Sequence, residues 1–488
     1  MVARKASSWR DVIIITPGNL SHATMALTLQ GDKGKVRGFG ISGKGAFMPS
    51  IDQSIFSSDF KEEPYWWEAF RPQAIAATTL PAKTDVVVVG GGYAGLATAR
   101  ALADGGVQSL VLEAGEFGSG ASTRSGGALS AGLSIGKSFT GRTLDYAPEL
   151  VRDVVGWAID AYRGLIDLVE QEKIDCHLEQ RGRFLGACAA SHYEGLRTRF
   201  EKLRSGGATD CKLISREEQR QEIGSDFYHG GMVFETAGKL HPALFYGGLL
   251  AAARRRNSIT LAGGCRATGL RRDGEGWRVT TEAGEVRARH VVVATNGYTG
   301  GLTPTLQRRL VPIASHIIAT EELPPGLAAK ICPKGRTFSE TRRVLHYYRL
   351  SPDGKRVIFG GRARFTEIPG ALRAQLLHRA LIERLPELAG IKVTHTWQGN
   401  VAFTYDALPH AGELDGLHFV VGCNGSGVSM MPFLGDAIGR SIAGRLHGKL
   451  PFADAALPPI PLYSGKPWFL PMIGGAFRAL DYIDEKVR

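Results

Sequence analysis

Runs of apolar residues, punctuated by glycine and proline, divide the chain into strands and helices. The run Asp85–Val89 is short and mostly apolar, which predicts a buried strand, and residues 96–103 continue with a helical pattern. A second apolar run, Leu110–Leu112, follows a glycine pair and ends at an acid. Between Pro148 and Glu172 apolar residues recur at helical spacing, which predicts a long amphipathic helix. Strand, helix and strand in this order predict a βαβ unit with a parallel sheet.

The middle and the end of the chain add further strands. Residues 259–289 contain four short alternating segments, typical of a small antiparallel sheet. Residues 290–295 form a buried-strand run that we expect to return to the parallel sheet. Residues 310–320 and 343–361 predict strands of a second sheet, and a last strand at 416–421 leads into a final helix. The parallel sheet is therefore expected to be assembled from separated segments of the chain.

Three glycines mark the turn between the first strand and its helix. Gly90, Gly92 and Gly95 fit the pattern G-x-G-x-x-G. The first glycine permits a tight turn, the second lets the backbone approach a pyrophosphate, and the third lets the helix pack on the strand. Free N–H groups at the helix N-terminus favour the negative charge of a diphosphate. Glu113 ends the second strand at about the spacing from which an acid reaches ribose hydroxyls. The segment predicts a dinucleotide-binding unit.

Charge and cysteine content narrow the function classes. Lys and Arg number 59 against 47 Asp and Glu, a net charge of +12. The densest basic runs lie at an expected helix end and a turn, so nucleic-acid binding is not predicted. The six cysteines form no C-x-x-C pair, and no metal site is predicted. Sparse thiols and the lack of an apolar run near the ~20 residues of a membrane helix predict a cytoplasmic protein with no transmembrane segment.

Eight passages of the chain carry a resemblance to a known family. They read VVVVGGGYAGLATARALADGG at 86–106, LEAGEFGSGASTRSGG at 112–127, GKLHPALFYGGLLAAA at 238–253, VVVATNGYTGGL at 291–302, PIASHIIATEELP at 312–324, HYYRLSPDGKRVIFGGR at 346–362, WQGNVAFTYDALPHAGEL at 397–414 and GCNGSGVSMMPFLG at 422–435. Together they resemble the D-amino-acid oxidase superfamily of FAD-dependent oxidoreductases. Within it, the chain is most similar to the branch of gamma-glutamylputrescine oxidoreductase and glycine or sarcosine oxidase.

The resemblance implies an α/β fold, α+β overall. A Rossmann-like FAD-binding domain is built from discontinuous segments, and a substrate domain contains a large antiparallel or mixed sheet. The predicted division is a poorly structured N-terminal extension at 1–47, FAD-binding segments at 48–175, 232–302 and 397–450, substrate-domain segments at 176–231 and 303–396, and a C-terminal tail packed on the body at 451–488. The extension also fits an upstream start codon with the natural start at Met48, or a basic targeting segment. The first two interpretations are favoured because no clear amphipathic helix is present.

The cofactor implied by the resemblance is FAD. Gly90, Gly92 and Gly95 would hold its pyrophosphate, and Glu113 its adenosine ribose. The second motif, which in the family runs along the diphosphate toward the flavin ring, here contains Ser122, Thr123, Arg124 and Ser125. The final helix opens at Gly425 and Gly427. Its N-terminus would face the flavin N1 and C2 carbonyl, where reduced flavin carries negative charge.

The attachment of FAD is expected to be non-covalent. Some relatives bond the flavin to a histidine in the second motif, where this chain has Arg124. Others use a cysteine before the WQGN passage. Here Cys332 comes too early in the chain to fill that place.

The family reaction is oxidation of a C–N bond. Hydride passes from the carbon beside a neutral amine to flavin N5, and the imine hydrolyses to a carbonyl product. The flavin supplies the chemistry, so no Ser-His-Asp triad or carboxylate pair is expected. The substrate is a small amine or amino acid, and the electron acceptor is O2 or a quinone or another electron carrier.

Four residues are candidates for the substrate face: Tyr298, His316, Arg349 and Trp397. An arginine near the flavin can bind a substrate carboxylate through two parallel hydrogen bonds. Each candidate also has a structural interpretation. Arg349 fits an ion pair equally well, and His316, in an apolar strand, fits a hydrogen-bonded core group better than a catalyst.

Four functions stay open on these residues. The first is an FAD-dependent oxidase of an amine resembling gamma-glutamylputrescine, with O2 as acceptor. The second is a D-amino-acid dehydrogenase that passes electrons to the respiratory chain. The third is a flavin-binding protein without turnover. The fourth, an NAD-linked dehydrogenase, is disfavoured by the passage at 422–435.

Overall fold

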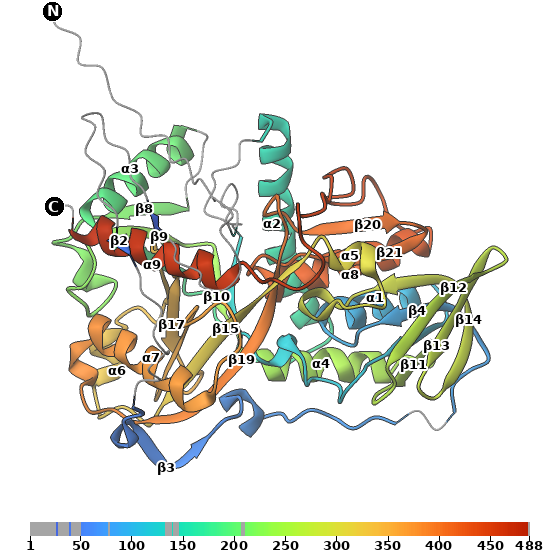
Figure 1. Cartoon of the computed structure of the whole chain (residues 1–488), viewed down its shortest axis with the longest axis horizontal. Coiled ribbons are helices and arrows are strands. Elements are labelled where there is room, and N and C mark those ends of the chain that lie inside the picture. Colours follow the sequence, from blue (N-terminus) through green and yellow to red (C-terminus); the bar gives the residue numbers. More distant parts are fainter. Residues whose placement is uncertain are drawn as a thin grey trace, which may run out of the picture. The chain divides into compact units, whose positions relative to one another are not determined.

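The computed structural model describes residues 26–27, 39–40, 50–76, 79–131, 139, 146–205 and 210–486. The chain divides into two compact units, residues 1–51 and 52–488. The first unit holds the antiparallel pair β1 (Ala26–Leu27) and β2 (Phe39–Gly40). The rest of the predicted extension lies outside the described residues. The other sheets and the helices belong to the second unit (Figure 1).

The first sheet has a parallel centre. Its strands are β4 (Lys83–Val89), β5 (Ser109–Leu112), β11 (Ile259–Ala262), β12 (Ala267–Asp273), β13 (Gly276–Thr281), β14 (Gly284–Val293), β20 (His410–Leu414) and β21 (Leu417–Val421). In the order β11-β5-β4-β14-β21 every pair is parallel, whereas β12 and β13 extend β14 as an antiparallel meander and β20 pairs antiparallel with β21. Val86, Val87 and Val88 are fully buried, as expected for a strand covered on both faces. The βαβ prediction is confirmed.

Helices cover this parallel centre. They are α1 (Tyr93–Asp104), α2 (Pro148–Gln171), α4 (Pro242–Arg254) and α8 (Gly427–Ile442). The helix α1 contacts both α4 and α8, and α8 contacts α2; in Figure 1 α1, α4 and α8 lie together beside β4. The observed bounds of α2 match the helix predicted after Pro148.

One strand pairs differently from the prediction. The segment starting at Ile259 was expected to join the small antiparallel sheet, but β11 pairs in parallel with β5. The helix α4 directly precedes it, so β11 enters the sheet after a helical crossover. Its neighbours β12, β13 and the start of β14 do form the expected antiparallel meander.

The second sheet is larger and mixed. Its strands are β3 (Phe56–Lys61), β7 (Arg183–Gly186), β8 (Cys211–Ile214), β9 (Gly231–Phe234), β15 (Val311–Thr320), β16 (Thr337–Glu340), β17 (His346–Leu350), β18 (Val357–Gly361) and β19 (Val393–Phe403). They are arranged in the order β3-β19-β15-β18-β17-β16-β7-β9-β8. The helix α7 (Gly370–Arg384) contacts β15, β18 and β19. The expected large mixed sheet is confirmed, while the segment boundaries of the domains stay a prediction.

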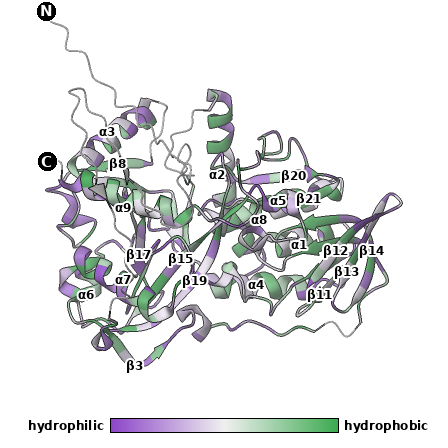
Figure 2. Cartoon of the chain, in the orientation of Figure 1, coloured by the Kyte–Doolittle hydropathy of each residue, from purple (hydrophilic) through white to green (hydrophobic). Residues whose placement is uncertain are grey.

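The remaining elements connect these layers. They include α3 (Ala190–Ser205), α5 (Pro304–Gln307), α6 (Leu327–Ile331), α9 (Leu470–Lys486), the pair β6 (Ala128–Ser130) and β10 (Ala237–Lys239), and the short 3-10 helices η1 (Gln53–Ile55), η2 (Tyr65–Glu68), η3 (Ala121–Thr123), η4 (Gln219–Gln221), η5 (Asn296–Tyr298) and η6 (Pro386–Leu388). In Figure 2 green and purple residues both occur along β12, β13 and β14. In β13 every second residue is buried, as expected for strands with one packed face and one exposed face.

Candidate functional site

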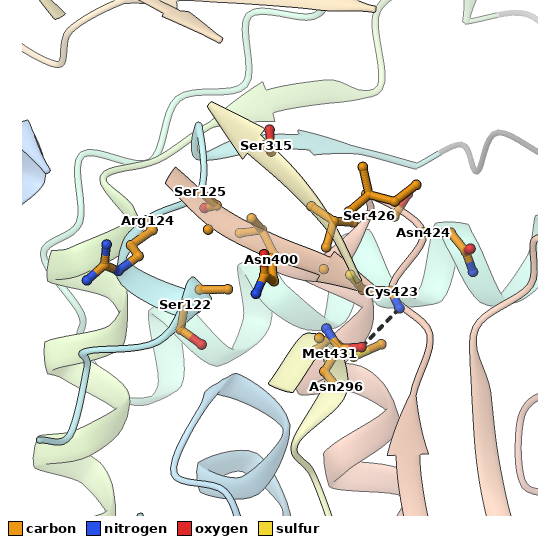
Figure 3. Close-up of a pocket in the computed structure, with 18 of the residues that line it drawn as sticks. Ser122, Arg124, Ser125, Asn296, Ser315, Asn400, Cys423, Asn424, Ser426 and Met431 are labelled. Carbon is orange, nitrogen blue, oxygen red and sulfur yellow. Dashed lines mark hydrogen bonds between the residues drawn. The ribbon is translucent and has the colours of Figure 1, made fainter. Parts of the chain in front are cut away.

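One large cavity connects the first sheet to the second. Its volume is about 1470 Å³, and it runs from the turn after β4 to residues of β15, β17 and β19. The carboxyl ends of β4, β5 and β14 meet at the cavity, which is where open α/β sheets bind their ligands. Figure 3 shows Ser122, Ser125, Asn296, Ser315 and Asn400 around this space.

The glycine-rich turn lies at one end of the cavity. Gly90 and Gly92 line it, and Gly92 precedes the first residue of α1. Gly90 has φ +109°, a conformation that a side chain rarely adopts. Gly95 does not line the cavity: a Cβ atom on it would lie 1.9 Å from the carbonyl oxygen of Gly90. The third glycine is thus required by packing of the helix on the turn, which is the reason the motif needs it.

Glu113 holds the same turn from the end of β5. Its Oε2 atom accepts a hydrogen bond from the Gly91 amide at 3.0 Å, and its Oε1 atom accepts one from the Gly115 amide at 3.1 Å. The residue lines the cavity. Its carboxylate is therefore fixed beside the glycine turn, where the sequence placed a ribose-binding acid.

The second motif passes beside the N-terminus of α1. The Ser122 hydroxyl accepts a hydrogen bond from the Tyr93 amide at 3.1 Å, and Ser122, Arg124 and Ser125 line the cavity. Thr123 is buried and does not line it; its hydroxyl donates to the Gly118 carbonyl at 2.6 Å. Three of the four predicted residues of this motif therefore face the space, and the fourth fixes the loop.

Three tryptophans hold this motif from outside the cavity. The indole Nε1 of Trp397 donates to the Arg124 carbonyl at 2.8 Å, and that of Trp66 donates to the Ser125 carbonyl at 2.9 Å. The indole of Trp67 donates to the Thr123 hydroxyl at 2.9 Å. Trp66 and Trp397 are almost completely buried. Sequence reasoning placed Trp397 at the substrate, whereas its indole contacts the backbone behind the second motif.

The tip of α8 closes the opposite side of the cavity. Gly425 and Gly427 line the cavity together with Asn296, which follows β14. The Asn296 side-chain oxygen accepts from the amides of Gly422 and Cys423 at 3.0 and 3.4 Å, and Figure 3 shows the second of these bonds. Asn296 therefore ties the end of β14 to the loop that precedes α8. The Gly90 turn and the Gly427 tip lie in one site, as the sequence predicted.

The second sheet lines the cavity from several strands, among them β15 and β17, which lie on either side of β18. Ser315 of β15 and Tyr347 of β17 both line it, and their hydroxyls are hydrogen bonded at 3.0 Å. His316 points to the other face, because successive side chains of a strand alternate. It is fully buried on the side of Arg373 in α7, and burial followed by that charge lowers its pKa to about 4. His316 is therefore not a substrate residue in this structure.

Arg349 lines the cavity but is bonded to backbone. Its guanidinium donates to the carbonyls of Leu240 at 2.7 Å and Gly127 at 3.3 Å, and its Nη2 atom is buried with no hydrogen-bond partner among the described residues. Burial lowers its pKa to about 10. The ion pair considered from the sequence is absent among the described residues. Tyr298 stands at the rim, 52% exposed, with its hydroxyl 3.5 Å from the Asn400 amide.

Arg362 is a cavity residue that sequence reasoning missed. It follows β18, and its guanidinium lies over the rings of Phe403 and Phe365, with 4.8 and 5.7 Å from its central carbon to the ring centroids. Burial lowers its pKa to about 10. No carboxylate among the described residues pairs with it. The alternation of side chains along a strand could have revealed it. Gly360 pairs with the cavity residues Ile317 and Tyr347. Arg362 lies two residues beyond Gly360 and therefore faces the same side of the sheet.

The family of this chain follows from comparison with known proteins. A family model described as FAD dependent oxidoreductase matches residues 85–440. The chain belongs to this family. It is 30% identical over 391 residues to the probable oxidoreductase OrdL of Rhizobium meliloti, covering 77% of this chain and 88% of the relative. It is 29% identical over 405 residues to the gamma-glutamylputrescine oxidoreductase of Escherichia coli, covering 81% and 92%. The resemblance found in the sequence is confirmed.

Solved structures agree with the fold. Glycine oxidase from Geobacillus kaustophilus superposes with a TM-score of 0.65 at 21% identity, covering 76% of this chain and 98% of that one. L-proline dehydrogenase from P. horikoshii gives a TM-score of 0.62 at 19% identity, covering 76% and 96%. FAD is the cofactor of the family. The cavity suits it: the turn and α1 offer amide donors, Glu113 is fixed nearby, and the space is continuous to the tip of α8.

Membrane helices, metal sites and disulfides were also considered in the described part of the chain. In the described part of the chain no helix is long and apolar enough to cross a membrane. No group of three or more His, Cys, Asp or Glu residues in the described ranges is arranged to hold a metal ion. All six cysteines are buried and free.

Proposed function

We propose that this oxidoreductase uses non-covalent FAD to oxidise the C–N bond of an amine or amino acid, with an amine resembling gamma-glutamylputrescine as substrate and O2 as acceptor. The observation that carries the proposal is the continuous cavity between the FAD turn and the second sheet, with Arg349 and Arg362 facing it. The name of the Escherichia coli relative, gamma-glutamylputrescine oxidoreductase, supports the substrate class.

The cofactor is assigned to residues on both sides of the cavity. Gly90, Gly92 and the start of α1 would bind the pyrophosphate, and Glu113 would bind the adenosine ribose. The second motif would contribute Ser122, Arg124 and Ser125 along the cofactor, and the tip of α8 at Gly425 and Gly427 would face the flavin ring. Bound FAD supplies the acceptor for the hydride that leaves the carbon beside the amine nitrogen.

The chain's own residues prepare the substrate. The Arg362 cation disfavours a second positive charge beside it, so it favours an unprotonated amine. The same guanidinium, with the unpartnered Nη2 of Arg349, can bind a carboxylate of the substrate. The Tyr347–Ser315 hydroxyl pair adds donors and acceptors at the same wall. Glu340, which also lines the cavity, is held by two hydrogen bonds from Arg384 at 2.7 and 2.9 Å and is not available as a base.

An anaerobic substrate screen tests this function. Purified holoenzyme is mixed with primary and secondary amines, acylated polyamines, and D- and L-amino acids, and the absorbance of oxidised flavin is followed. Loss of that absorbance with an acylated polyamine is the expected result. Bleaching with none of the compounds contradicts the proposal, and bleaching with free D-amino acids alone favours a D-amino-acid dehydrogenase. Hydrogen peroxide released under air identifies O2 as the acceptor.

A further inference from the structure

Two arginines line the part of the cavity that is bounded by β7 and α3. Arg183 lies on the cavity face of β7, and Arg199 lies on the face of α3 that lines the same cavity. Both guanidinium groups lie over one ring, that of Phe234, at 5.0 Å and 5.6 Å from its centroid. The ring of Phe234 therefore positions both guanidinium groups at the same part of the cavity.

Neither arginine is neutralised by the described part of the chain. No ion pair or side-chain hydrogen bond joins them to a described residue, and the Nε atom of Arg183 is buried without a partner. Carboxylates nearby are engaged elsewhere: Glu235 pairs with Arg336 and Lys212. On α3 itself Arg197 pairs with Glu194. Arg197 and Arg336 each have an acidic partner, whereas Arg183 and Arg199 have none among the described residues.

Two uncompensated cations so close together are unfavourable without an anion. Burial, and after it the charge of Arg199, lowers the pKa of Arg183 to about 10. A planar guanidinium pair presents donors that match a carboxylate, and such charge-assisted bonds are strong in a partly buried site. The ring of Phe234 keeps both side chains in place through cation–π contact. One anionic group beside Phe234 would offset the charge of both arginines.

The position in the sheet sets the length of the ligand. Four strand-to-strand steps separate β15 from β7, which is about 19 Å at the usual strand spacing. An extended chain gains roughly 1.2 Å per bond, so an acid about nine bonds from the reacting carbon spans about 11 Å. The remaining span of about 8 Å is close to the length of one extended arginine side chain, roughly six bonds from Cα to a terminal nitrogen. A free amino acid is too short to occupy both ends.

We propose that Arg183 and Arg199 form a second, remote subsite that binds the terminal carboxylate of an extended amine substrate, an inference that rests on the proposed function. The subsite selects acylated amines whose acyl group ends in an acid over amines of the same length that end in a neutral group. Arg362 and Arg349 stay at the reacting end. The binding energy of the remote acid serves recognition, so its loss is expected in KM and not in kcat.

A matched pair of substrates tests the subsite. Glutarylputrescine ends in a carboxylate, and its terminal carboxamide differs by that group alone. The wild-type holoenzyme is expected to show a KM at least about tenfold lower for the acid. In the Arg183→Gln/Arg199→Gln double variant this preference disappears with little change in kcat. Arg197→Gln, the same change on the same helix, keeps the preference. A preference that persists in the double variant overturns the subsite.

A binding measurement separates the subsite from the proposed function. The monopropylamide of glutaric acid has the acid but no oxidisable amine, and its affinity for each holoenzyme is measured by calorimetry. The double variant is expected to bind it about tenfold or more weakly than wild type. If no amine bleaches the flavin but this loss is seen, the proposed function fails and the subsite stands. If amines are oxidised but wild type and the double variant bind the monopropylamide with equal affinity, the subsite is contradicted and the proposed function stands. If the double variant loses FAD, the single variant Arg199→Gln, at an exposed helix position, replaces it in the comparison with wild type, and weaker binding of the monopropylamide is again expected.

Discussion

At the scale of single residues, Gly95 shows how little room the cofactor turn leaves. A Cβ atom there would lie 1.9 Å from the Gly90 carbonyl oxygen, which is backbone and cannot move alone. Gly95→Ala is therefore expected to push α1 away from the turn, lowering the free energy of unfolding by about 3 kcal/mol and reducing FAD content. Denaturant unfolding and flavin absorbance measure both effects.

The matched control for this change is Gly164→Ala in α2. A Cβ atom at Gly164 would meet nothing within 4 Å, so the same substitution is expected to raise stability by up to about 1 kcal/mol through helix propensity. If the Gly95→Ala variant were as stable as wild type and retained its full FAD content, the packing explanation would be contradicted.

Trp397 gives a second prediction at this scale, for a residue that acts through the backbone. In Trp397→Phe the Arg124 carbonyl loses the indole donor at 2.8 Å, while most of the buried ring volume is kept. An unmade buried hydrogen bond costs about 1–3 kcal/mol, so FAD is expected to bind roughly tenfold more weakly. Titration of the apoprotein with FAD, followed by flavin fluorescence, measures the affinity. Trp468→Phe, at an exposed position, should bind FAD like wild type.

Local sequence predicts which residues build the cofactor turn, but not which way strand residues face. Gly90, Gly92 and Glu113 lie where the motif places them because strand, turn and helix are adjacent in sequence. The orientations of His316 and Arg362 could be predicted only from the strand register. His316 faces α7, whereas Arg362 faces the cavity. A strand buried on both faces shows no hydrophobic alternation, so the composition of β15 could not tell its two sides apart.

At the scale of elements, a buried ion pair joins the second sheet to α7. Arg384 of α7 donates to Glu340 of β16 at 2.7 and 2.9 Å, and both side chains are fully buried. The guanidinium and the nearby His346 hold the pKa of Glu340 well below its usual range, despite burial. Glu340→Gln leaves the buried Arg384 guanidinium with the half-exposed Glu383 as its remaining acid, so a loss of about 3–5 kcal/mol in unfolding free energy is expected.

Denaturant unfolding checks this loss against an exposed pair. Arg220 and Asp226 are also hydrogen bonded, but their side chains are 52% and 70% exposed. Asp226→Asn is therefore expected to cost less than about 1 kcal/mol. If Glu340→Gln proves as mild as Asp226→Asn, the Glu340–Arg384 pair does not secure α7 to the sheet.

The bounds of an element can be predicted from sequence when its own apolar pattern is long enough to define it. The bounds of α2 and β15 agree with the predicted segments because their apolar patterns are long. The partner of β11 does not follow from its own four residues, since parallel pairing with β5 depends on the crossover through α4. The remote arginine pair is similar: β7 and α3 are close in sequence, but their shared cavity is completed by strands more than 100 residues later.

At the scale of the whole molecule, buried histidines couple stability to pH. His241 caps α4, with its Nδ1 accepting a hydrogen bond from the Leu244 amide at 3.2 Å, which requires that atom to be unprotonated. Burial, then Arg349 and His177, lower the pKa of His241 to about 4. Burial and Arg373 do the same for His316. Both rings stay neutral in the folded protein at pH values where an unfolded chain protonates them.

The unfolding free energy is therefore expected to fall as the pH is lowered from about 6.5 toward 4. In this window the unfolded state binds protons that the folded state does not, so each ring's contribution is complete above pH 6.5 and is lost on acidification. By pH 4.5 the loss is roughly 2.5 kcal/mol per histidine. Urea unfolding of wild type and His316→Gln at pH 7, 5.5 and 4.5, in saturating FAD, measures it. The variant should lose about 2.5 kcal/mol less than wild type over this range, while His447→Gln, at an exposed position, should follow wild type. Parallel pH profiles for wild type and His316→Gln would show that His316 is protonated equally in both states.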